Sequence, residues 1–394
     1  MSLDLYIYLA VAPLIILSMA SVIYAVMYRF YLNSHHGDVN ANVTIIMAMT
    51  GVSENFANLL TKLNSQIVKP SKLLIGVESE SDPGYRKILD LRSSVDFPIE
   101  ISIAGLATDC SQKSHNLLSA FSLIDNGKDT GNYIVLCDAD INPPVWWLSA
   151  LIKPLINKKA DLVTGYRWQQ TQSMGLWANL IVFLDRKIAL LPRPESAQLI
   201  WGGSVSMTNI VFQSILKSGV LSKTLSDDLT IGSYSYLKGF KVLHRRLLLV
   251  PSLAPQGLRA AWSFGVRQYK IIKIYRPIVW VLAFLGALLR VVGWFLVIYL
   301  SLIKPVYIFV IAFLYILSLL QVFIEMKITE LLNLKENRQG WIYQYSLILI
   351  RPCIDLFQFF IIMASVFSNR ISWSHVDYLI DSPGSVRVSM RRDC

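Results

Sequence analysis

Residues 133–144 read YIVLCDADINPP, an apolar run that passes directly into two aspartates and then into two prolines. The run 134–137 predicts a buried strand. A proline pair cannot continue a central strand, because proline has no amide hydrogen for the ladder. Asp138 and Asp140 therefore come at the strand's end, and their spacing of two places both side chains on one face of an extended segment. Two adjacent like charges favour a shared cation.

The segments around this motif alternate between strand-like and helix-like patterns. Expected strands cover residues 43–49, 73–77, 99–103, 133–137 and 162–166, with one helix capped by Ser53 after the first and another from Gln112 to about Ile124. This alternation predicts an α/β fold with a largely parallel sheet. Ligands of such sheets bind beyond the carboxyl ends of the strands, where Glu78, Glu80, Asp82 and the aspartate pair fall. No dinucleotide or Walker fingerprint is present.

The composition indicates that part of the chain lies in a membrane. Hydrophobic residues make up 54% of the chain and charged residues only 16%, which is too apolar for a wholly soluble protein. The uncharged stretch 5–28 is long enough to span about 30 Å of hydrocarbon as a helix, and Arg29 follows it. We expect a transmembrane anchor over residues 1–29. A cleavable signal peptide is the alternative, but its apolar region would be shorter and would follow basic residues.

Further apolar segments lie near the C-terminus. Residues 278–303 and 306–324 predict two spans joined by a short turn. Residues 353–367 are marginal in length and contain Asp355, so we expect this segment to dip into the membrane or lie along it. By the positive-inside rule, basic residues beside the spans place the intervening chain in the cytoplasm. The expected order is an anchor (1–29), a cytoplasmic α/β domain (40–255), a basic interfacial helix (256–277), membrane helices (278–368) and a cytoplasmic tail (369–394).

The net charge of +11 makes nucleic acid a partner to consider. The basic residues, however, crowd next to a predicted span and are interleaved with aromatic residues, which suits an anionic lipid surface better. We therefore expect membrane association and no nucleic-acid binding. The four cysteines form no Cys-x-x-Cys pair, so neither a zinc site nor a disulfide framework is indicated. The oligomeric state is not encoded in any pattern.

Four groups of residues are candidates for chemistry. Asp138 and Asp140 suit Mg²⁺ or Mn²⁺, which take oxygen ligands and are completed by phosphate oxygens; an acidic turn is the alternative. Asp227 and Asp228 open an expected helix, either as a cap or with Asp228 as a base for an attacking hydroxyl. Lys113 opens another helix and is either solvated or in contact with a diphosphate. Arg267 and Lys270 share one helix face and are spaced to reach a diphosphate.

Taken in order, these stretches resemble the ceramide glucosyltransferase family, glycosyltransferase family 21, a branch of the inverting GT-A enzymes. They are "VESESDPG" (77–84), "QKSHNL" (112–117), "LCDADI" (136–141), "WGGSVSM" (201–207), "SDDLTIG" (226–232) and "RQYKI" (267–271). The tail "ISWSHVDYLI" (371–380) is similar to the family's Ile-Ser-Trp ending. The resemblance extends from Val43 onward and rests on the order and spacing of the motifs.

The resemblance implies a GT-A domain, a Rossmann-like nucleotide-diphospho-sugar transferase, joined to transmembrane helices. It implies transfer of one sugar from a UDP-sugar, expected to be UDP-glucose, to the hydroxyl of ceramide or another membrane lipid at the cytoplasmic face. In this reading, the metal ligands are Asp138 and Asp140, the donor-binding residues are Glu78, Glu80, Asp82, Lys113, Arg267 and Lys270, and the catalytic residues are Asp228 and Asp227.

Two motifs depart from the family's pattern. The family's first aspartate falls at or beside Ser79, so its role would pass to Glu78, Glu80 or Asp82. The family's Arg-Trp pair is replaced by Lys270-Ile271, which keeps a positive charge but loses the guanidinium fork and the ring. Substrate identity is therefore less well defined than fold and reaction class.

Other functions remain open at this point. A hopanoid or a glycerolipid would accept a sugar by the same chemistry. A processive polysaccharide synthase would require more membrane spans and an intact Gln-x-x-Arg-Trp element. An inactive membrane scaffold that only binds nucleotide sugar would follow if the altered motifs abolished catalysis.

Overall fold

The computed structural model describes residues 3–33, 39–124, 133–171 and 175–392, and for residues 3–10 only their backbone. The chain forms two compact units. One, the α/β unit, comprises Asn33–Trp168, Arg193–Ser252 and Asn369–Cys394. The other, the helical unit, comprises Met1–Leu32, Gln169–Pro192 and Leu253–Ser368.

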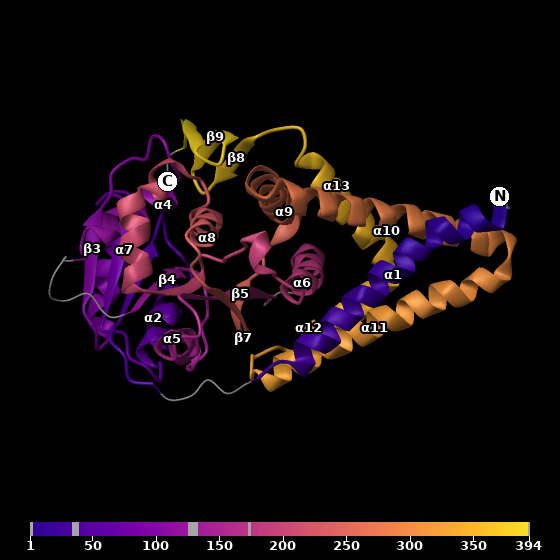
Figure 1. Ribbon diagram of the computed structural model, residues 1–394, viewed down its shortest axis with the longest axis horizontal. Coiled ribbons are helices and arrows are strands. Elements are labelled where there is room, and N and C mark those ends of the chain that lie inside the picture. The colour runs from indigo at the N-terminus through magenta and orange to yellow at the C-terminus, as the bar shows by residue number, and fades with distance from the viewer. Residues whose placement is uncertain (1–2, 34–38, 125–132, 172–174, 393–394) are drawn as a thin grey trace. The chain divides into compact units, whose positions relative to one another are not determined.

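A seven-stranded sheet forms the centre of the α/β unit (Figure 1). Its strands lie in the order β3 (Ile99–Ile103), β2 (Lys72–Val77), β1 (Val43–Ala48), β4 (Tyr133–Asp138), β6 (Ser204–Thr208), β5 (Leu162–Gln170) and β7 (Val242–Leu253). The neighbours from β3 to β4 are parallel, whereas β6 runs antiparallel to both β4 and β5. The five predicted strands are confirmed. The expectation of a largely parallel sheet holds for one side only, because β6 and β7 were not foreseen.

Helices cover both faces of this sheet, as the alternation along β6 shows. Val205 and Met207 pack in the core with α4 (Gln112–Phe121) and α7 (Asn209–Ser218). On the opposite face, Ser204 Oγ accepts a hydrogen bond from Trp147 Nε1 of α5 (Trp147–Ile156) at 2.8 Å. Leu148 N donates to Gln66 Oε1 at 3.0 Å, which places α2 (Phe56–Asn64) beside α5.

Local contacts at the strand ends refine the predictions. The cap of α2 is Asn55 and not Ser53, whose hydroxyl instead donates to Ala139 O at 3.0 Å. That prediction was wrong because the first turn of the helix begins two residues later than the polarity pattern suggested. At Gly76 in β2, a Cβ atom would lie 1.9 Å from Asn116 O, so only glycine allows β2 and α4 to approach this closely.

The remaining elements of the α/β unit lie at the carboxyl ends of the strands or beyond them. These are α3 (Pro83–Leu91), α8 (Asp227–Leu237) and a second, three-stranded antiparallel sheet of β8 (Arg370–Trp373), β9 (Val376–Ser382) and β10 (Ser385–Arg391). Val388 N donates to Thr108 O at 3.2 Å. The C-terminal residues, expected only as a tail, therefore form an ordered sheet that packs against the loop before α4. Single 3-10 turns lie at Arg92–Ser94, Glu195–Ala197, Val220–Lys223, Pro305–Tyr307 and Ile348–Ile350.

The helical unit contains α1 (Leu3–Phe30), α6 (Leu176–Ala189), α9 (Gly257–Tyr275), α10 (Pro277–Ile303), α11 (Ile308–Leu331), α12 (Arg338–Leu347) and α13 (Arg351–Ala364). Four stretches are long and apolar enough to cross a membrane: Val11–Phe30, Pro277–Ile303, Pro305–Leu331 and Arg338–Ala364. The first three agree with the predicted spans. The fourth is longer than expected, because helix continues backward through α12 and Pro352 occupies the first turn of α13, where no amide hydrogen is needed.

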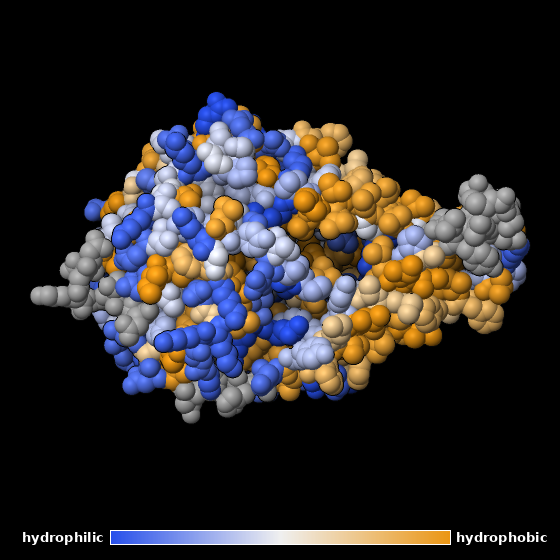
Figure 2. Space-filling model, viewed as in Figure 1, coloured by the Kyte–Doolittle hydropathy of each residue, from blue (hydrophilic) through white to orange (hydrophobic). Residues whose placement is uncertain are grey.

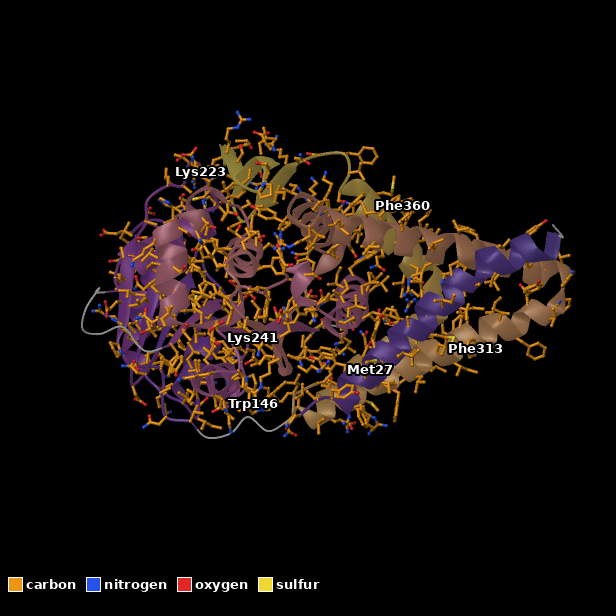
Figure 3. The ribbon with its side chains drawn as sticks, in the orientation of Figure 1. Met27, Trp146, Lys223, Lys241, Phe313 and Phe360 are labelled. Carbon is orange, nitrogen blue, oxygen red and sulfur yellow. The ribbon has the colours of Figure 1, made fainter. Side chains whose placement is uncertain are left out.

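Apolar side chains cover the outer surface of the helical unit. Met27 of α1, Phe313 of α11 and Phe360 of α13 are exposed (Figure 3), and Figure 2 shows hydrophobic residues over much of this unit. Charged residues in the same helices are turned inward: Arg351 Nε lies 3.0 Å from Asp355 Oδ2, and both residues are buried. Apolar exteriors with inward-facing, paired charges are typical of helices in hydrocarbon.

Candidate functional site

Four acidic residues from distant parts of the chain lie around one lysine in the α/β unit. Lys113 Nζ is 2.7 Å from Asp138 Oδ1, at the end of β4, and 3.3 Å from Asp227 Oδ1, at the start of α8. Burial alone lowers the pKa of Lys113, but its attraction to Asp138, Asp227 and Asp228 outweighs this and raises the pKa above the ordinary value. Lys113 is therefore a permanent cation at the middle of an acidic centre.

The local sequence explains why Lys113 lies there. Ser111 caps α4, its hydroxyl accepting a hydrogen bond from Ser114 N at 3.0 Å, so Lys113 projects from the first helical turn. Ser111 N donates to Thr224 O at 2.9 Å, which ties the start of α4 to the loop that precedes α8. This bond brings the lysine and Asp227 together.

Two glycines before β6 allow the backbone to enter the same centre. A Cβ atom on Gly202 would lie 2.7 Å from Asp227 Oδ2 and 3.3 Å from Lys113 Nζ, and one on Gly203 would lie 2.8 Å from Asp138 Oδ2. Any side chain at either position would displace a charged group. The predicted convergence of the β4 aspartates with the α8 aspartates is thus present in the structure.

Asp228, the predicted base, is held by three donors. It accepts hydrogen bonds from Leu229 N at 2.8 Å, from Gly202 N at 3.4 Å and from the Ser226 hydroxyl. These bonds fix the direction of the carboxylate, and the side chain is only half-buried. Asp228 is therefore an oriented carboxylate that interacts with Lys113 and has access from outside.

Asp227 lies deeper than Asp228, and burial affects its pKa. Burial raises the pKa of Asp227 to about 6; Lys113 opposes the rise, and Asp228 and Asp138 reinforce it. Among the residues that the structure describes, Asp227 Oδ2 has no hydrogen-bond partner. Asp227 anchors Lys113 rather than facing an acceptor.

Asp140 lies at the open edge of the centre. The pKa of Asp140 is raised, because surrounding protein atoms limit the hydration of its carboxylate and because Asp138 is close. In the described part of the chain, no three His, Cys, Asp or Glu side chains form a complete metal site. Asp138 and Asp140 are the carboxylates of this centre that could hold a divalent ion, since Mg²⁺ and Mn²⁺ take oxygen ligands.

The three acidic candidates after β2 are in different environments. Asp82 caps α3 and accepts hydrogen bonds from Gly84 N at 2.7 Å and Gly51 N at 2.9 Å, so its carboxylate is committed to the backbone. Glu80 is exposed. Glu78 is buried and lies 3.1 Å from both His375 Nε2 and Arg391 Nη1 of the C-terminal sheet. Glu78 is thus the candidate that remains for the role of the family's first aspartate.

Arg267 and Lys270 belong to α9 of the helical unit, not to the unit that contains the acidic centre. The Arg267 guanidinium lies 5.8 Å from the centroid of the Phe264 ring. Burial, with help from Lys273, lowers the pKa of Lys270. The role of these two residues at the donor stays a prediction.

Sequence reasoning left several neighbours of the centre without a role. Gly202 and Gly203 lie in a motif that it quoted, and their role was detectable, because consecutive glycines indicate a close approach of the backbone. His375 and Arg391 were not, because 297 and 313 residues separate them from Glu78. No local sequence pattern indicates a contact between residues that lie this far apart in the chain.

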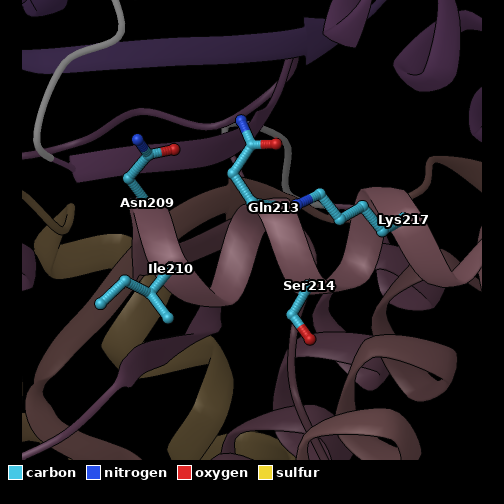
Figure 4. Close-up of a pocket in the computed structure, with 5 residues that line it drawn as sticks. All are labelled: Asn209, Ile210, Gln213, Ser214 and Lys217. Carbon is cyan, nitrogen blue, oxygen red and sulfur yellow. The ribbon is translucent and has the colours of Figure 1, made fainter. Parts of the chain in front are cut away.

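A separate hollow lies along α7 (Figure 4). It is lined by Asn209, Ile210, Gln213, Ser214 and Lys217. All five belong to one helix, and none of them belongs to the acidic centre. We assign no function to this hollow.

Comparison with known proteins agrees with this fold. Residues 10–386 match Glycosyl transferase family 21. The mannosyltransferase PcManGT from Pyrobaculum calidifontis, solved with GDP-Man and Mn²⁺, is similar in structure with a TM-score of 0.53 at 12% identity, over 91% of this chain and 99% of that one. Glucosyl-3-phosphoglycerate synthase from Mycobacterium tuberculosis, solved with Mn²⁺ and UDP-Glc, gives a TM-score of 0.36 at 10% identity over 59% of this chain and 78% of that one. No curated protein matches the chain. The likeness to PcManGT shows the GT-A fold, and the family match spans nearly the whole chain, so the protein belongs to glycosyltransferase family 21.

Proposed function

We propose that the protein is a membrane-bound inverting glycosyltransferase that moves one sugar from a UDP-sugar, with UDP-glucose expected, to the hydroxyl of a membrane lipid, with ceramide expected. The observation that carries this proposal is the meeting of Asp138, Lys113, Asp227 and Asp228 at one end of the sheet. A family 21 chain with apolar helices gives that centre both a sugar-transfer chemistry and a lipid environment.

The donor would bind at the carboxyl ends of β2 and β4. Asp138 and Asp140 would hold Mg²⁺ or Mn²⁺, which neutralises negative charge on the departing diphosphate when it is bound. Lys113 lies within 3.3 Å of two aspartates, so its ammonium is fixed in position to meet a phosphate oxygen beside them. Arg267 and Lys270 would assist with additional positive charge.

Asp228 would act as the base. As an ionised carboxylate it is a weak base, and it would accept the proton of the acceptor hydroxyl late, as the bond to the sugar forms. Its three hydrogen-bond donors fix the carboxylate in one direction, which favours attack along a single line and hence inversion at the sugar carbon. The membrane helices would bring the lipid hydroxyl to this carboxylate, a proximity effect.

The topology of the chain limits how it crosses the membrane. The C-terminal sheet belongs to the α/β unit, so the chain from Ser252 to Asn369 must cross an even number of times. Three stretches between these residues are long enough to span, and α10 and α11 are joined by a short turn as a hairpin. We therefore propose that Arg338–Ala364 does not cross, and that the α/β unit lies on the cytoplasmic face.

Cysteines introduced at Lys335 and Asp381, which flank this stretch, test the topology. Both should react with a membrane-impermeant maleimide from the same, cytoplasmic side. Labelling of the two positions from opposite sides would show that Arg338–Ala364 crosses.

The decisive experiment for the base is Asp228→Asn in the purified full-length protein. UDP should still bind with Mn²⁺, while the rate of sugar transfer should fall by about 10²–10⁴-fold, the usual loss for a general base. Asp381→Asn, which alters an exposed partner of Arg387, is the matched control and should retain its rate. Near wild-type turnover by Asp228→Asn would rule out the assigned base.

Substrate identity is tested by incubating the wild-type protein with a panel of UDP-sugars and total membrane lipid, and by reading the products by mass spectrometry. A single hexose on ceramide supports the proposal. A glycosylated hopanoid or glycerolipid would show that the reaction is as proposed but that the acceptor is another lipid. A sugar polymer would indicate a processive synthase. Absence of UDP release with every lipid would indicate an inactive scaffold.

Removal of the metal tests the role of Asp138 and Asp140. EDTA should abolish UDP binding, and unaffected binding would show that these two residues do not hold a metal for the nucleotide.

A further inference from the structure

The C-terminal sheet makes its closest contacts with the part of the α/β unit where the donor would bind. Glu78, directly after β2, is buried between two side chains of this sheet. His375 Nε2 lies 3.1 Å from Glu78 Oε2 and 3.4 Å from Oε1, and Arg391 Nη1 lies 3.1 Å from Oε1. These two side chains fix the position of the carboxylate.

Arg391 also holds the loop that leads into α4. Its Nη2 donates to Ala107 O at 2.7 Å and to Gln112 Oε1 at 2.9 Å. Gln112 N in turn donates to the hydroxyl of Tyr378 at 2.9 Å. Gln112 is the residue before Lys113, so the C-terminal sheet fixes the helical turn from which the central lysine projects.

An aromatic ring of the same sheet lies on the other side of that lysine. The centroid of the Trp373 ring is 6.0 Å from Lys113 Nζ. Trp373 is half-buried. A half-buried ring, a buried carboxylate and a lysine side by side are the three groups that bind the parts of a nucleotide: a surface for stacking, an acceptor for a base N–H and a charge for the diphosphate.

One buried polar atom in this group has no hydrogen-bond partner among the residues that the structure describes. It is His375 Nδ1, on a side chain that is 9% exposed. Contacts that served only to fasten the tail would be expected to satisfy such an atom, because a buried polar atom without a partner costs free energy. Free hydrogen-bonding capacity beside the end of a parallel strand points to a ligand.

We propose that the C-terminal sheet is one wall of the donor subsite. Arg391 and His375 hold the Glu78 carboxylate in place as an acceptor for the imide N–H of the base, and Trp373 presents its ring to the bound nucleotide. The inference rests on the proposed function, since it assigns the recognition of the donor in the same site. Three of the last 22 residues thereby take part in binding a nucleoside diphosphate. Trp373 contacts it, and His375 and Arg391 position Glu78.

The test titrates the full-length protein in lipid nanodiscs with UDP in the presence of MnCl₂, by calorimetry. Arg391→Met and Trp373→Ala should each raise the Kd for UDP by about tenfold, the loss expected for one charge-assisted contact or one stacked base. Trp373→Phe should recover most of the affinity, because it keeps an aromatic face. Arg387→Met is the matched control, since Arg387 lies in the same strand and pairs only with exposed Asp381 in the contacts described, and its Kd should be unchanged.

A second measurement distinguishes direct contact between the C-terminal sheet and the nucleotide from an indirect effect of the sheet on the structure of the site. Cytosine has no imide N–H, so the wild-type protein should bind UDP more tightly than CDP. Glu78→Gln and Arg391→Met should lose this preference, whereas a protein that is merely loosened would bind both nucleotides more weakly by the same factor. If Arg391→Met does not fold, as judged by thermal unfolding without nucleotide, Trp373→Ala and Glu78→Gln decide the question.

The possible failures are distinguishable. If the wild-type protein binds UDP and Arg391→Met and Trp373→Ala bind it with the same Kd, the inference is overturned and the proposed function is left intact. Equal weakening of UDP and CDP binding in the variants also overturns it. Absence of any UDP or GDP binding by the wild-type protein with Mn²⁺ overturns the proposed function itself.

Discussion

Replacing Lys113 by methionine tests whether this residue holds the acidic centre together. The side chain keeps its length but loses the charge that lies 2.7 Å from Asp138 and 3.3 Å from Asp227. At an effective dielectric constant of about 20, each attraction is worth about 5–6 kcal/mol before the cost of desolvation. Removing one partner of a buried pair typically costs about 3–5 kcal/mol after that cost. We expect Lys113→Met to lower the free energy of unfolding by about 3 kcal/mol at neutral pH.

The defect should depend on pH with a definite sign. Lys113 opposes the rise in the pKa of Asp227, which is about 6 in the wild-type protein, so the pKa of Asp227 in the variant should be higher still. The folded variant then binds a proton that the unfolded chain releases, and its stability should begin to increase above about pH 6 as the pH falls, before the stability of the wild-type protein does. The destabilisation relative to wild type should therefore shrink in acid.

Denaturant unfolding in detergent, followed by tryptophan fluorescence, measures both effects. Lys72→Met is the control, because Lys72 pairs at 3.8 Å with Glu100, which is 45% exposed, and such surface pairs contribute about 1 kcal/mol or less. The reasoning is refuted if Lys113→Met is no more destabilising than Lys72→Met, or if its defect is the same at about pH 5 as at about pH 7.5.

Three further predictions concern other parts of the structure. Gly202→Ala should abolish sugar transfer, since its methyl group would lie 2.7 Å from Asp227 Oδ2, whereas Gly286→Ala, with open space around it, should not; transfer assays compare the two. Burial, with help from Arg193, lowers the pKa of His244 to about 4, so His244 is neutral in the folded protein at neutral pH. The free energy of unfolding should then fall by at most about 3 kcal/mol as the pH drops from about 6.5 to about 4, and His244→Asn should remove this part of the acid sensitivity in thermal melts. Burial raises the pKa of Cys110 to about 11 and that of Cys137 well above its ordinary value, so neither thiol should react with maleimide at neutral pH until the protein is unfolded, as mass spectrometry would show.

Much of the α/β unit follows from local sequence patterns. β2 and β4 were predictable from their apolar runs, because burial on both faces leaves few polar residues to interrupt them. β3, with the sequence IEISI at the edge of the sheet, was predictable from the alternation of apolar and polar residues. β6 was not predictable in this way. Its Ser204 and Ser206 are buried polar residues whose hydroxyls bond to Trp147 and Leu151, so its polarity reflects side-chain bonding and not exposure to water.

The length of the last apolar stretch, Arg338–Ala364, was underestimated for a similar reason. α12 contains Gln344, which is buried and donates to Asn179 O at 3.2 Å, and polar residues of this kind lower the apparent hydropathy of a segment. Pro352 also suggested a break, although it lies in the first turn of α13. In both places a tertiary contact or a position within a helix determined the outcome, and the residue type alone did not.

The residues of the acidic centre, and the meeting of the β4 and α8 aspartates, were predictable from the motifs, but the strand pairing that brings them together was not. Asp138, Lys113 and Asp228 could each be chosen from their motifs, because charged residues at strand ends and helix starts are where ligands bind. Their meeting around Gly202 depends on the pairing of β6 with β4. That pairing is antiparallel and joins residues that are distant in the chain, so spacing within motifs does not report it.

The contact of Arg391 with Glu78 sets the order in which the protein can mature. During synthesis, β2 leaves the ribosome early and β10 leaves last, after both helices of the hairpin have been made. The two residues are 313 positions apart in the chain. Closing so long a loop costs conformational entropy, so the contact forms slowly. The apolar helices of a nascent chain are therefore complete while Glu78 still lacks its partner. A chain shortened by a premature stop codon before Arg391 would keep the seven-stranded sheet and the apolar helices yet carry the Glu78 carboxylate without its arginine.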